Sequence, residues 1–243
     1  MKRNSIPVVL NKCLKTLSAN LISRKSVQGF FIMSLLLVTF GCGSKNVIRS
    51  SYSPRISPRD MVMENSLKKV KEQRLFYVLN FQDKRGDVDP YLIWKAKGLH
   101  EYRLSEKNLS DYLYESFIFD LQRIGMNITP ANDASILLSD IVSKAQTAPE
   151  NADYIVSIDV YKCIPEFKTK WRTVKTFYMY DFHLKTWDIN RSKMIFDEHI
   201  ARSIEGTSKT LVLFSDLVDE LLNDYLKEMN FDMAEVLMRY NHN

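Results

Sequence analysis

The sequence has little cysteine, glycine or proline. Of its three cysteines, Cys163 is the only one that follows Cys42, so no disulfide framework can hold the fold. Seven glycines and seven prolines in 243 residues are too few for a low-complexity, disordered chain. The sequence also lacks a phosphate loop, a His-Glu-x-x-His motif, a Gly-x-Ser-x-Gly motif and a nucleotide-binding glycine pattern. We therefore expect no catalytic residue and no cofactor.

Acidic residues are missing from the first 42 positions. This part of the chain holds six of the 34 basic residues and none of the 29 acidic ones. The rest of the chain therefore has 28 basic and 29 acidic residues, a net charge of −1. That balance excludes a strongly basic nucleic-acid-binding protein, so we expect no nucleic-acid partner.

A short uncharged stretch at residues 29–42 follows this basic segment. It is apolar or small throughout, and it is shorter than the roughly 20 residues that a membrane-spanning helix needs. A basic region, a short apolar region and a small residue at the end are typical of a secretory leader. We therefore predict a signal peptide over residues 1–41 and an exported chain.

Cys42 directly follows Gly41, and this pair resembles the lipobox of bacterial lipoproteins, in which the cysteine is lipidated and becomes the first mature residue. Thr39 and Phe40 stand where that pattern usually has leucine and a small residue. Ordinary cleavage that leaves Cys42 as a plain thiol is the alternative. The resemblance implies a membrane anchor on Cys42. Because Gly43 is not aspartate, it also implies the outer membrane, with the domain facing the periplasm.

Residues 43–60 are rich in serine, proline and basic side chains, and no acid precedes Asp60. We predict a lipidated cysteine and flexible tether over residues 42–71 and a single globular domain over residues 72–243. A flexible stretch of 18 residues reaches roughly 23 Å. Its basic residues either stay solvated or touch anionic headgroups.

Two elements of the domain have strong local signals. The run at residues 75–81 is apolar on both faces, which predicts an interior strand. A helical stripe follows at residues 109–124, with Asn108 or Ser110 as its cap and Gly125 as its stop. The other expected elements are a short helix or lead-in at 61–71, a loop at 87–103, a short strand at 126–129 and a second helix at 130–142. A last helix begins at residue 215. It either is interrupted at Asn230 or continues through it to residue 240.

Three longer stretches alternate apolar and polar residues, at 153–163, 173–187 and 194–204, with a turn at 188–192. Such alternation predicts antiparallel strands with one buried and one solvated face. The pattern as a whole predicts an α+β fold, with a mixed, mostly antiparallel sheet of about four to five strands and two to three helices packed on one face.

This order of elements resembles a group of small Gram-negative lipoproteins: the YajG-like proteins, the PqiC-like auxiliary lipoproteins of lipid-transport complexes and the penicillin-binding-protein activator LpoB. These share an α/β sandwich similar to the amino-terminal domain of TolB. The resemblance covers residues 72–230. It rests on Asn80-Phe81-Gln82-Asp83-Lys84-Arg85, Arg123-Ile124-Gly125-Met126 and Ala152-Asp153-Tyr154. It implies an envelope adaptor or regulator, with no catalytic activity.

Two places are candidate contacts with a partner or the membrane. Residues 162–175 interleave basic and aromatic side chains, with Lys168, Lys170 and Arg172 around Trp171. This stretch is either a plain solvated connection between two strands or a tip that touches headgroups, glycan or an acidic patch. The second candidate is Asp83 with Arg85, which form either a capping ion pair at a strand end or part of a partner site.

Histidines are candidate metal ligands. His183 with Asp181, and His199 with Asp197 and Glu198, lie on neighbouring expected strands, so they meet on the polar face if those strands pair. A zinc site needs three or four converging ligands. We therefore expect a solvated surface and no metal.

The sequence thus predicts a non-enzymatic adaptor of the bacterial envelope, anchored through Cys42 and bound to an unidentified envelope protein. One alternative is a subunit of a secretion or lipid-transport complex that oligomerises through its sheet edge. Another is an enzyme with an unrecognised site.

Overall fold

The chain forms an α+β fold, as the sequence predicts. The computed structural model describes residues 45–48, 52–95, 101–144, 148–170, 173–208 and 214–241. The strands are β1 (Lys45–Ile48), β2 (Phe76–Val78), β3 (Gln82–Asp83), β4 (Leu92–Lys95), β5 (Glu101–Leu104), β6 (Ile128–Pro130), β7 (Tyr154–Lys170), β8 (Thr173–Asp188) and β9 (Lys193–Ser208). The helices are α3 (Pro58–Leu67), α4 (Leu109–Arg123), α5 (Leu138–Val142) and α6 (Phe214–Tyr240).

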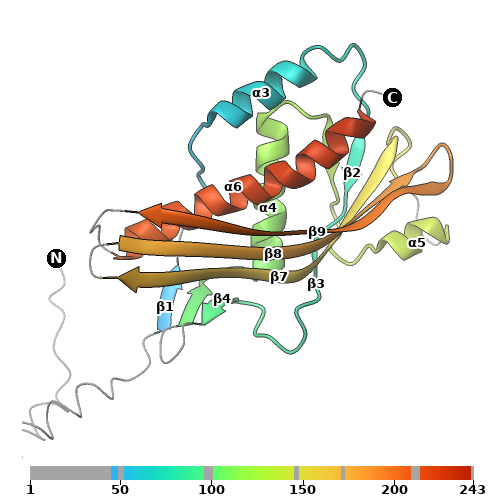
Figure 1. The fold of residues 1–243 in the computed structure, drawn as a ribbon. Helices are drawn as coiled ribbons and strands as arrows, with labels where there is room; N and C mark the ends of the chain where they lie inside the picture. The colour runs from blue at the N-terminus through green and yellow to red at the C-terminus, as the bar shows by residue number, and fades with distance from the viewer. Residues whose placement is uncertain are drawn as a thin grey trace, which may run out of the picture. The chain divides into compact units, whose positions relative to one another are not determined.

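The larger sheet is mixed and has the strand order β6-β2-β7-β8-β9, with β3 paired to β7. The short strand β2 is interior, because it pairs in parallel with β6 on one side and β7 on the other. Strands β7, β8 and β9 form an antiparallel meander, and Figure 1 shows them lying side by side. The predicted interior strand and the three predicted antiparallel strands are therefore confirmed.

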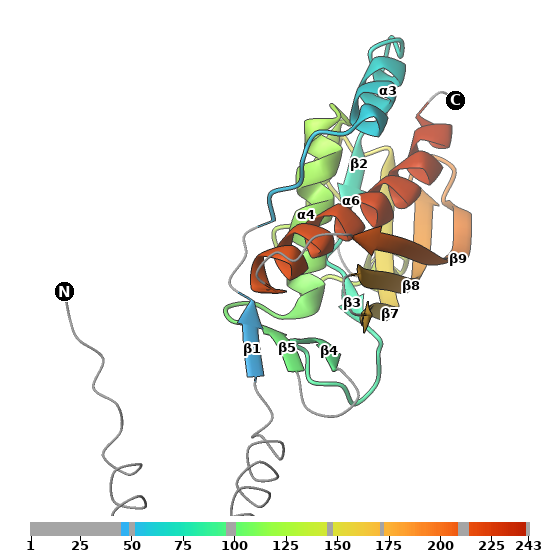
Figure 2. The same ribbon diagram turned by 60° about the vertical axis from the view of Figure 1, so that its left-hand side comes forward.

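Alternate side chains of the meander enter the main core. Val156 and Ile158 of β7 and Phe182 and Leu184 of β8 are fully buried. Helices α4 and α6 cover this face of the sheet, and Figure 2 shows them beside each other. The period of two in the sequence thus identified which side chains face the core.

Helix α4 begins and ends where the sequence indicates. The side chain of Asn108 accepts a hydrogen bond of 2.8 Å from the backbone N–H of Asp111, which caps the first turn. Gly125 has a φ of 85°, in the left-handed region that glycine tolerates, and its N–H donates to the carbonyl of Gln122. The predicted apolar stripe, which includes Leu113 and Phe117, is buried against the sheet.

The short helix α5 packs on the opposite face of the sheet. Tyr77, Leu79, Ile155 and Ile141 form a second, smaller core there. The predicted helix over residues 130–142 is thus shortened to five residues. Its first part is a turn instead, because the backbone N–H and the hydroxyl of Ser135 both donate to Asp133. The sequence predicts helices on one face of the sheet, whereas the described helices lie on both faces.

Residues 87–103 are not the loop that the sequence predicts. They contain β4 and β5, which with β1 form a separate three-stranded sheet of order β1-β5-β4. The pairing of β1 with β5 is parallel and joins Lys45 to Glu101. Local periodicity contains no signal for a pairing between segments so far apart in the chain.

Helix α6 is continuous for 27 residues and passes through Asn230 without a break. The buried amide of Asn230 donates to Asp120 at 2.8 Å and to Ser116 at 3.2 Å, both on α4, so it links two helices. Within the residues that the structure describes, no helix combines the length and the apolar character that crossing a membrane requires.

Replacing Leu113 by aspartate tests the core. Leu113 is fully buried on α4, and an unpaired carboxylate there costs several kcal/mol, comparable with the whole stability of a domain. We expect Leu113→Asp to be largely unfolded by circular dichroism and by denaturant titration. On the exposed side of the same helix, Gln122→Asp should change the free energy of unfolding by less than about 1 kcal/mol. Equal stability of the two variants would contradict the position of this core.

Candidate functional site

The segment Tyr52–Leu67, here called the docked segment, packs on the helices. The hydroxyl of Tyr52 donates to Asp120 of α4, and its ring meets that of Phe119 edge-on, with centroids 5.7 Å apart. Further along, Met63 and Leu67 are buried in the main core. The sequence placed this segment in a flexible tether over residues 42–71. The structure differs, because Lys45–Ile48 form β1 of the smaller sheet and the part from Tyr52 onward packs on the helices.

The start of α3 has a local cause that the sequence contained. The hydroxyl of Ser57 donates to Asp60 at 2.8 Å, and its backbone N–H donates to the same carboxylate, as in a capping box. Pro58 occupies the first helical position, where its missing N–H costs nothing. The helix therefore begins earlier than the predicted short helix or lead-in from residue 61.

A buried ion cluster of Asp60, Arg123 and Lys227 holds the docked segment against α4 and α6. Lys227 of α6 donates to Asp60 and to the carbonyl of Arg55, and its side chain is only 4% exposed. Arg123 of α4 donates to the other carboxylate oxygen of Asp60. Burial alone would raise the pKa of Asp60, but the hydrogen bonds from Lys227 and Ser57 and the charge of Arg123 outweigh it and lower this pKa.

Arg59 fixes the same helix from a second side. Its guanidinium group reaches three carboxylates of α6: Glu228 at 2.6 Å, Asp232 at 2.8 Å and Glu235 at 2.7 Å. These contacts raise the pKa of Arg59 although its burial opposes the shift. Together with the buried ion cluster, they determine which face of α3 points inward.

Asp120 lies next to the buried ion cluster and behaves differently. Its carboxylate is fully buried, and burial raises its pKa despite hydrogen bonds from Asn230 and Tyr52 and the nearby charge of Arg123. A carboxyl group whose pKa is raised on folding opposes folding above its ordinary pKa. Burial of the Asp120 carboxylate at neutral pH therefore depends on its three donors, Asn230, Tyr52 and Arg123.

The outer sheet face is the side of β7, β8 and β9 that points away from α4 and α6. His183 and His199 lie directly opposite each other on β8 and β9, and their rings stack with centroids 4.5 Å apart. Nε2 of His183 lies 2.6 Å from Asp197, and Nδ1 of His199 lies 2.6 Å from Asp181. The two predicted pairs do meet, but each histidine bonds the aspartate of the other strand.

Tyr161 extends this group of rings. Its side chain is 43% exposed, and its ring centroid lies 5.2 Å from that of His199. Lys185 forms an ion pair of 2.7 Å with Asp159 on the same face. Within the described ranges, no three His, Cys, Asp or Glu side chains are placed to hold a metal ion. The outer sheet face thus offers aromatic rings, imidazoles and carboxylates for contact with another molecule.

Asp83 and Arg85 form a close pair at the end of β3. Nε and an Nη of Arg85 donate to the two carboxylate oxygens of Asp83 at 2.9 and 2.7 Å, and the other Nη donates to the carbonyl of Leu92 in β4. Burial alone would raise the pKa of Asp83, but the hydrogen bonds from Arg85 outweigh it and lower this pKa. The pair thus joins β3 to β4, and its role in binding a partner stays a prediction.

The stretch from 162 to 175 is largely strand. Strand β7 continues to Lys170, β8 begins at Thr173, and Lys168 pairs with Lys175 across this hairpin. The first predicted strand, over residues 153–163, is too short, because the alternation of apolar and polar residues fades there while the backbone pairing continues. Trp171 and Arg172 lie outside the described residues.

The two cysteines beyond the leader differ. Cys42 lies outside the described residues, so its lipidation stays a prediction. Cys163 is buried in the core, and burial raises the pKa of its thiol to about 11. It therefore acts as a small apolar side chain, as the sequence indicates.

The low pKa of Asp60 has a testable consequence. A carboxyl group whose pKa is lowered by folding adds stability above its unfolded pKa of about 4 and loses it as the pH falls through the lower folded value. We expect Asp60→Asn to lower the free energy of unfolding at neutral pH by about 3 kcal/mol, because Lys227 loses its buried partner. The difference from wild type should shrink below about pH 4 in denaturant titrations. Asp87→Asn, at an exposed loop position, is the control, and its free energy of unfolding should match that of wild type at every pH. If the difference in free energy between Asp60→Asn and wild type did not change with pH, this account would be contradicted.

Comparisons with known proteins give a coarse resemblance. No protein-family model matches the chain, and no curated protein matches its sequence.

Similar solved structures include three bacterial proteins. Protein XCC0632 of Xanthomonas campestris, assigned to DUF330, is 10% identical, with 79% of this chain and 92% of that chain covered and a TM-score of 0.43. Lipoprotein GNA1162 of Neisseria meningitidis is 12% identical (64% and 97% covered, TM-score 0.31), and a minor lipoprotein of Acinetobacter baumannii is 10% identical (68% and 92%, TM-score 0.35). These values assign the chain to no specific family.

Proposed function

We propose that the chain is a lipoprotein, anchored to a membrane through Cys42, that acts as a non-enzymatic accessory protein in the bacterial cell envelope. The observation that carries this proposal is the basic leader with its short apolar run, which ends in Gly41-Cys42. It is supported by β1, because the chain joins the smaller sheet at Lys45, three residues after that cysteine, so an anchor on Cys42 would hold the domain near the membrane. The names of the Neisseria and Acinetobacter proteins agree with it.

The proposed destination is the outer membrane, with the domain facing the periplasm. Gly43 supports this choice, because it stands where inner-membrane retention by the family rule would need aspartate. Three acyl chains, as in bacterial lipoproteins, hold a protein firmly, since each buried methylene adds roughly 0.8 kcal/mol. The domain then works as a globule fixed at a membrane surface.

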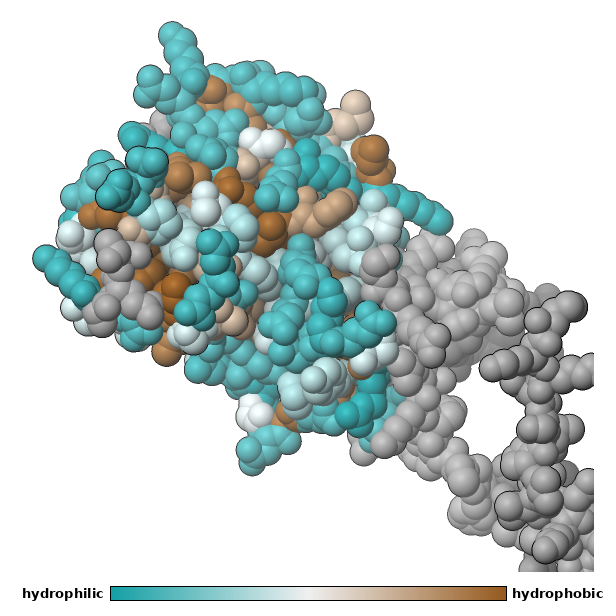
Figure 3. All heavy atoms as spheres, turned by 180° about the vertical axis from the view of Figure 1, so that it is seen from behind, coloured by the Kyte–Doolittle hydropathy of each residue, from teal (hydrophilic) through white to brown (hydrophobic). Residues whose placement is uncertain are grey.

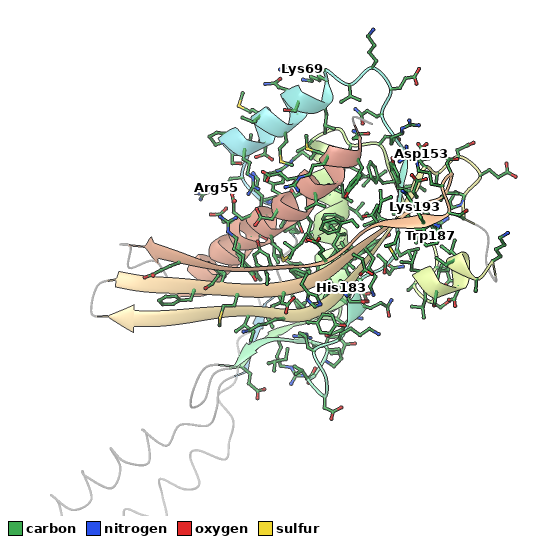
Figure 4. All side chains as sticks on the ribbon, turned by 45° about the vertical axis from the view of Figure 1, so that its right-hand side comes forward. Arg55, Lys69, Asp153, His183, Trp187 and Lys193 are labelled. Carbon is green, nitrogen blue, oxygen red and sulfur yellow. The ribbon has the colours of Figure 1, made fainter. Side chains whose placement is uncertain are left out.

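An adaptor also needs a surface for its partner, and the outer sheet face supports that role. It presents Tyr161, His183 and His199 together, with exposed charges around them. Figure 4 shows His183 at the sheet, while Arg55 and Lys69 lie beyond the helices. A partner on this face would therefore bind on the side of the sheet opposite the docked segment.

An oligomeric subunit of a secretion or lipid-transport complex is the second candidate. It is favoured by β9, a 16-residue strand at the edge of the sheet in the described order. An edge of this length can pair with another chain. Exposed Asp197, Glu198 and Arg202 on this strand argue for a monomer, since charges on an edge oppose such pairing. Light scattering after gel filtration separates the two: a ring would have several times the mass of one chain.

Cys42→Ser tests the anchor. Without the thiol there is no lipidation, so we expect the variant to remain an unprocessed precursor and to take up no radiolabelled palmitate in an expressing bacterium. Cys13→Ser is the matched control, because Cys13 lies within the predicted leader and should leave processing and labelling unchanged. If Cys42→Ser still matures to the normal size, the proposed anchor is wrong.

The hairpin of β7 and β8 is the subject of a separate prediction. Changing Lys168, Lys170 and Arg172 to serine should alter the free energy of unfolding by no more than about 0.5 kcal/mol, as for most surface changes. Binding to anionic vesicles or to a captured partner should weaken, and the remaining binding should depend less on salt. Trp171→Ala should weaken binding with less change in its salt dependence, because the contribution of tryptophan is apolar.

A charge-matched triple variant controls this experiment. Lys144, Arg191 and Lys193 are exposed cations away from the hairpin, and changing them to serine should leave binding unchanged. Equal binding by all variants would mean that the hairpin is only a solvated connection. A loss of 3 kcal/mol or more in Trp171→Ala would instead place that side chain in a core.

A further inference from the structure

The docked segment exposes an unusual amount of apolar surface on the side away from the helices. Ile56, Met61 and Val62 are 79%, 59% and 64% exposed, which are the three highest values among the large apolar side chains of the described chain. All three fall within seven consecutive residues. Figure 3 shows that apolar residues on the face it presents are interspersed with hydrophilic ones. Such a concentration in one short segment marks a contact surface.

This apolar side cannot turn inward. Along α3, the exposed Met61 and Val62 stand opposite the buried Met63 and Leu67, so the helix already uses its other face for the core. Arg59 adds three ion pairs to α6 on that inner side. Rotating the helix to hide Met61 and Val62 would break these contacts and expose buried charge.

Cations follow the exposed apolar group along the chain. Lys68, Lys69 and Lys71 lie at and beyond the end of α3, and all three are exposed. Two acidic residues lie among them: Glu64 pairs with Lys68 at 2.6 Å, and Glu72 follows Lys71. Apolar side chains followed by lysines match an anionic lipid surface, in which the apolar groups enter the headgroup region and the ammonium groups meet phosphate.

Chain length determines what lies within reach of this surface. Ile56 follows Cys42 by 14 positions, a distance of at most about 50 Å when fully extended. A protein held by lipid on Cys42 therefore keeps its docked segment within about 50 Å of that anchor. Figure 2 shows α3 on the side of the fold away from β7, β8 and β9.

We infer that the outward face of the docked segment, formed by Ile56, Met61 and Val62 with Lys68, Lys69 and Lys71, rests on the anionic lipid surface of the membrane. This inference deepens the proposed anchoring through Cys42 and rests on it for its biological setting. The contact turns a flexible attachment into an oriented one. The outer sheet face then points away from the lipid, toward the envelope proteins that the adaptor binds.

The first experiment does not need the lipid anchor. The described fold lies within Lys45–Asn243, a compact unit separate from Met1–Ser44, so an unlipidated chain that starts at Gly43 retains it. We expect this chain to bind phosphatidylcholine vesicles that contain phosphatidylglycerol, weakly but measurably at millimolar lipid. The triple variant Ile56→Ser, Met61→Ser, Val62→Ser should lower the partition coefficient at least about tenfold, because it removes the apolar groups that enter the headgroup region.

A matched triple variant is the control. Val88, Leu137 and Val142 are also large, apolar and exposed, but they lie elsewhere on the fold, and changing them to serine should leave the partition coefficient within about twofold. Unchanged thermal unfolding of both triple variants confirms that they are folded. Equal partition of the two triple variants, or no vesicle binding by the parent chain, would overturn the inference.

The second experiment uses the mature protein, which starts at lipidated Cys42 and is anchored in vesicles. An environment-sensitive fluorophore is attached at Val62→Cys or, for comparison, at Val142→Cys; buried Cys163 does not react. The probe at position 62 should be blue-shifted and quenched by aqueous iodide at least about fivefold less than the probe at position 142. Equal quenching would overturn the contact although the anchor holds. If Cys42 is not lipidated, the palmitate-labelling experiment with Cys42→Ser would show it separately. The vesicle-binding experiment with the unlipidated chain would then decide whether the docked segment contacts lipid.

Discussion

The buried ion cluster of Asp60, Arg123 and Lys227 is the constraint on which the arrangement depends. Each of its charges comes from a different helix, and each is buried or half-buried, so none is stable without the others. Removing one partner leaves an uncompensated charge, which typically costs more than an exposed ion pair contributes. The cluster therefore fixes the position of α3 on α4 and α6.

Sheet and helices divide the molecule into sides with different roles. One face of the meander packs on α4 and α6, and the docked segment covers those helices. The other face of the sheet is covered by α5 near Ile155 and presents Tyr161, His183 and His199 farther along. A membrane on the first side and a protein partner on the second would not compete for the same surface.

Sequence patterns predicted the parts of the fold that local chemistry determines. The period of two placed Val156 and Phe182 inward and His183 outward, and helical spacing with Asn108 and Gly125 defined α4. Long-range pairing was missed, because nothing near residue 45 indicates that β1 meets β5. The docked segment was missed although Ser57-Pro58 begins a helix there, because serine, proline and basic residues are also typical of linkers. Its anchoring partners lie on α4 and α6, far away in the sequence.

Each of the two stacked histidines bonds an aspartate on the other strand, and these bonds determine which ring nitrogen carries the hydrogen. An ionised aspartate only accepts hydrogen bonds, so a neutral His183 must carry its hydrogen on Nε2, toward Asp197. By the same argument His199 carries its hydrogen on Nδ1, toward Asp181. The second nitrogen of each ring is then a lone-pair acceptor in the neutral state. With both rings neutral, this part of the surface therefore favours groups that donate, such as backbone amides, hydroxyls and ammonium ions, over groups that only accept.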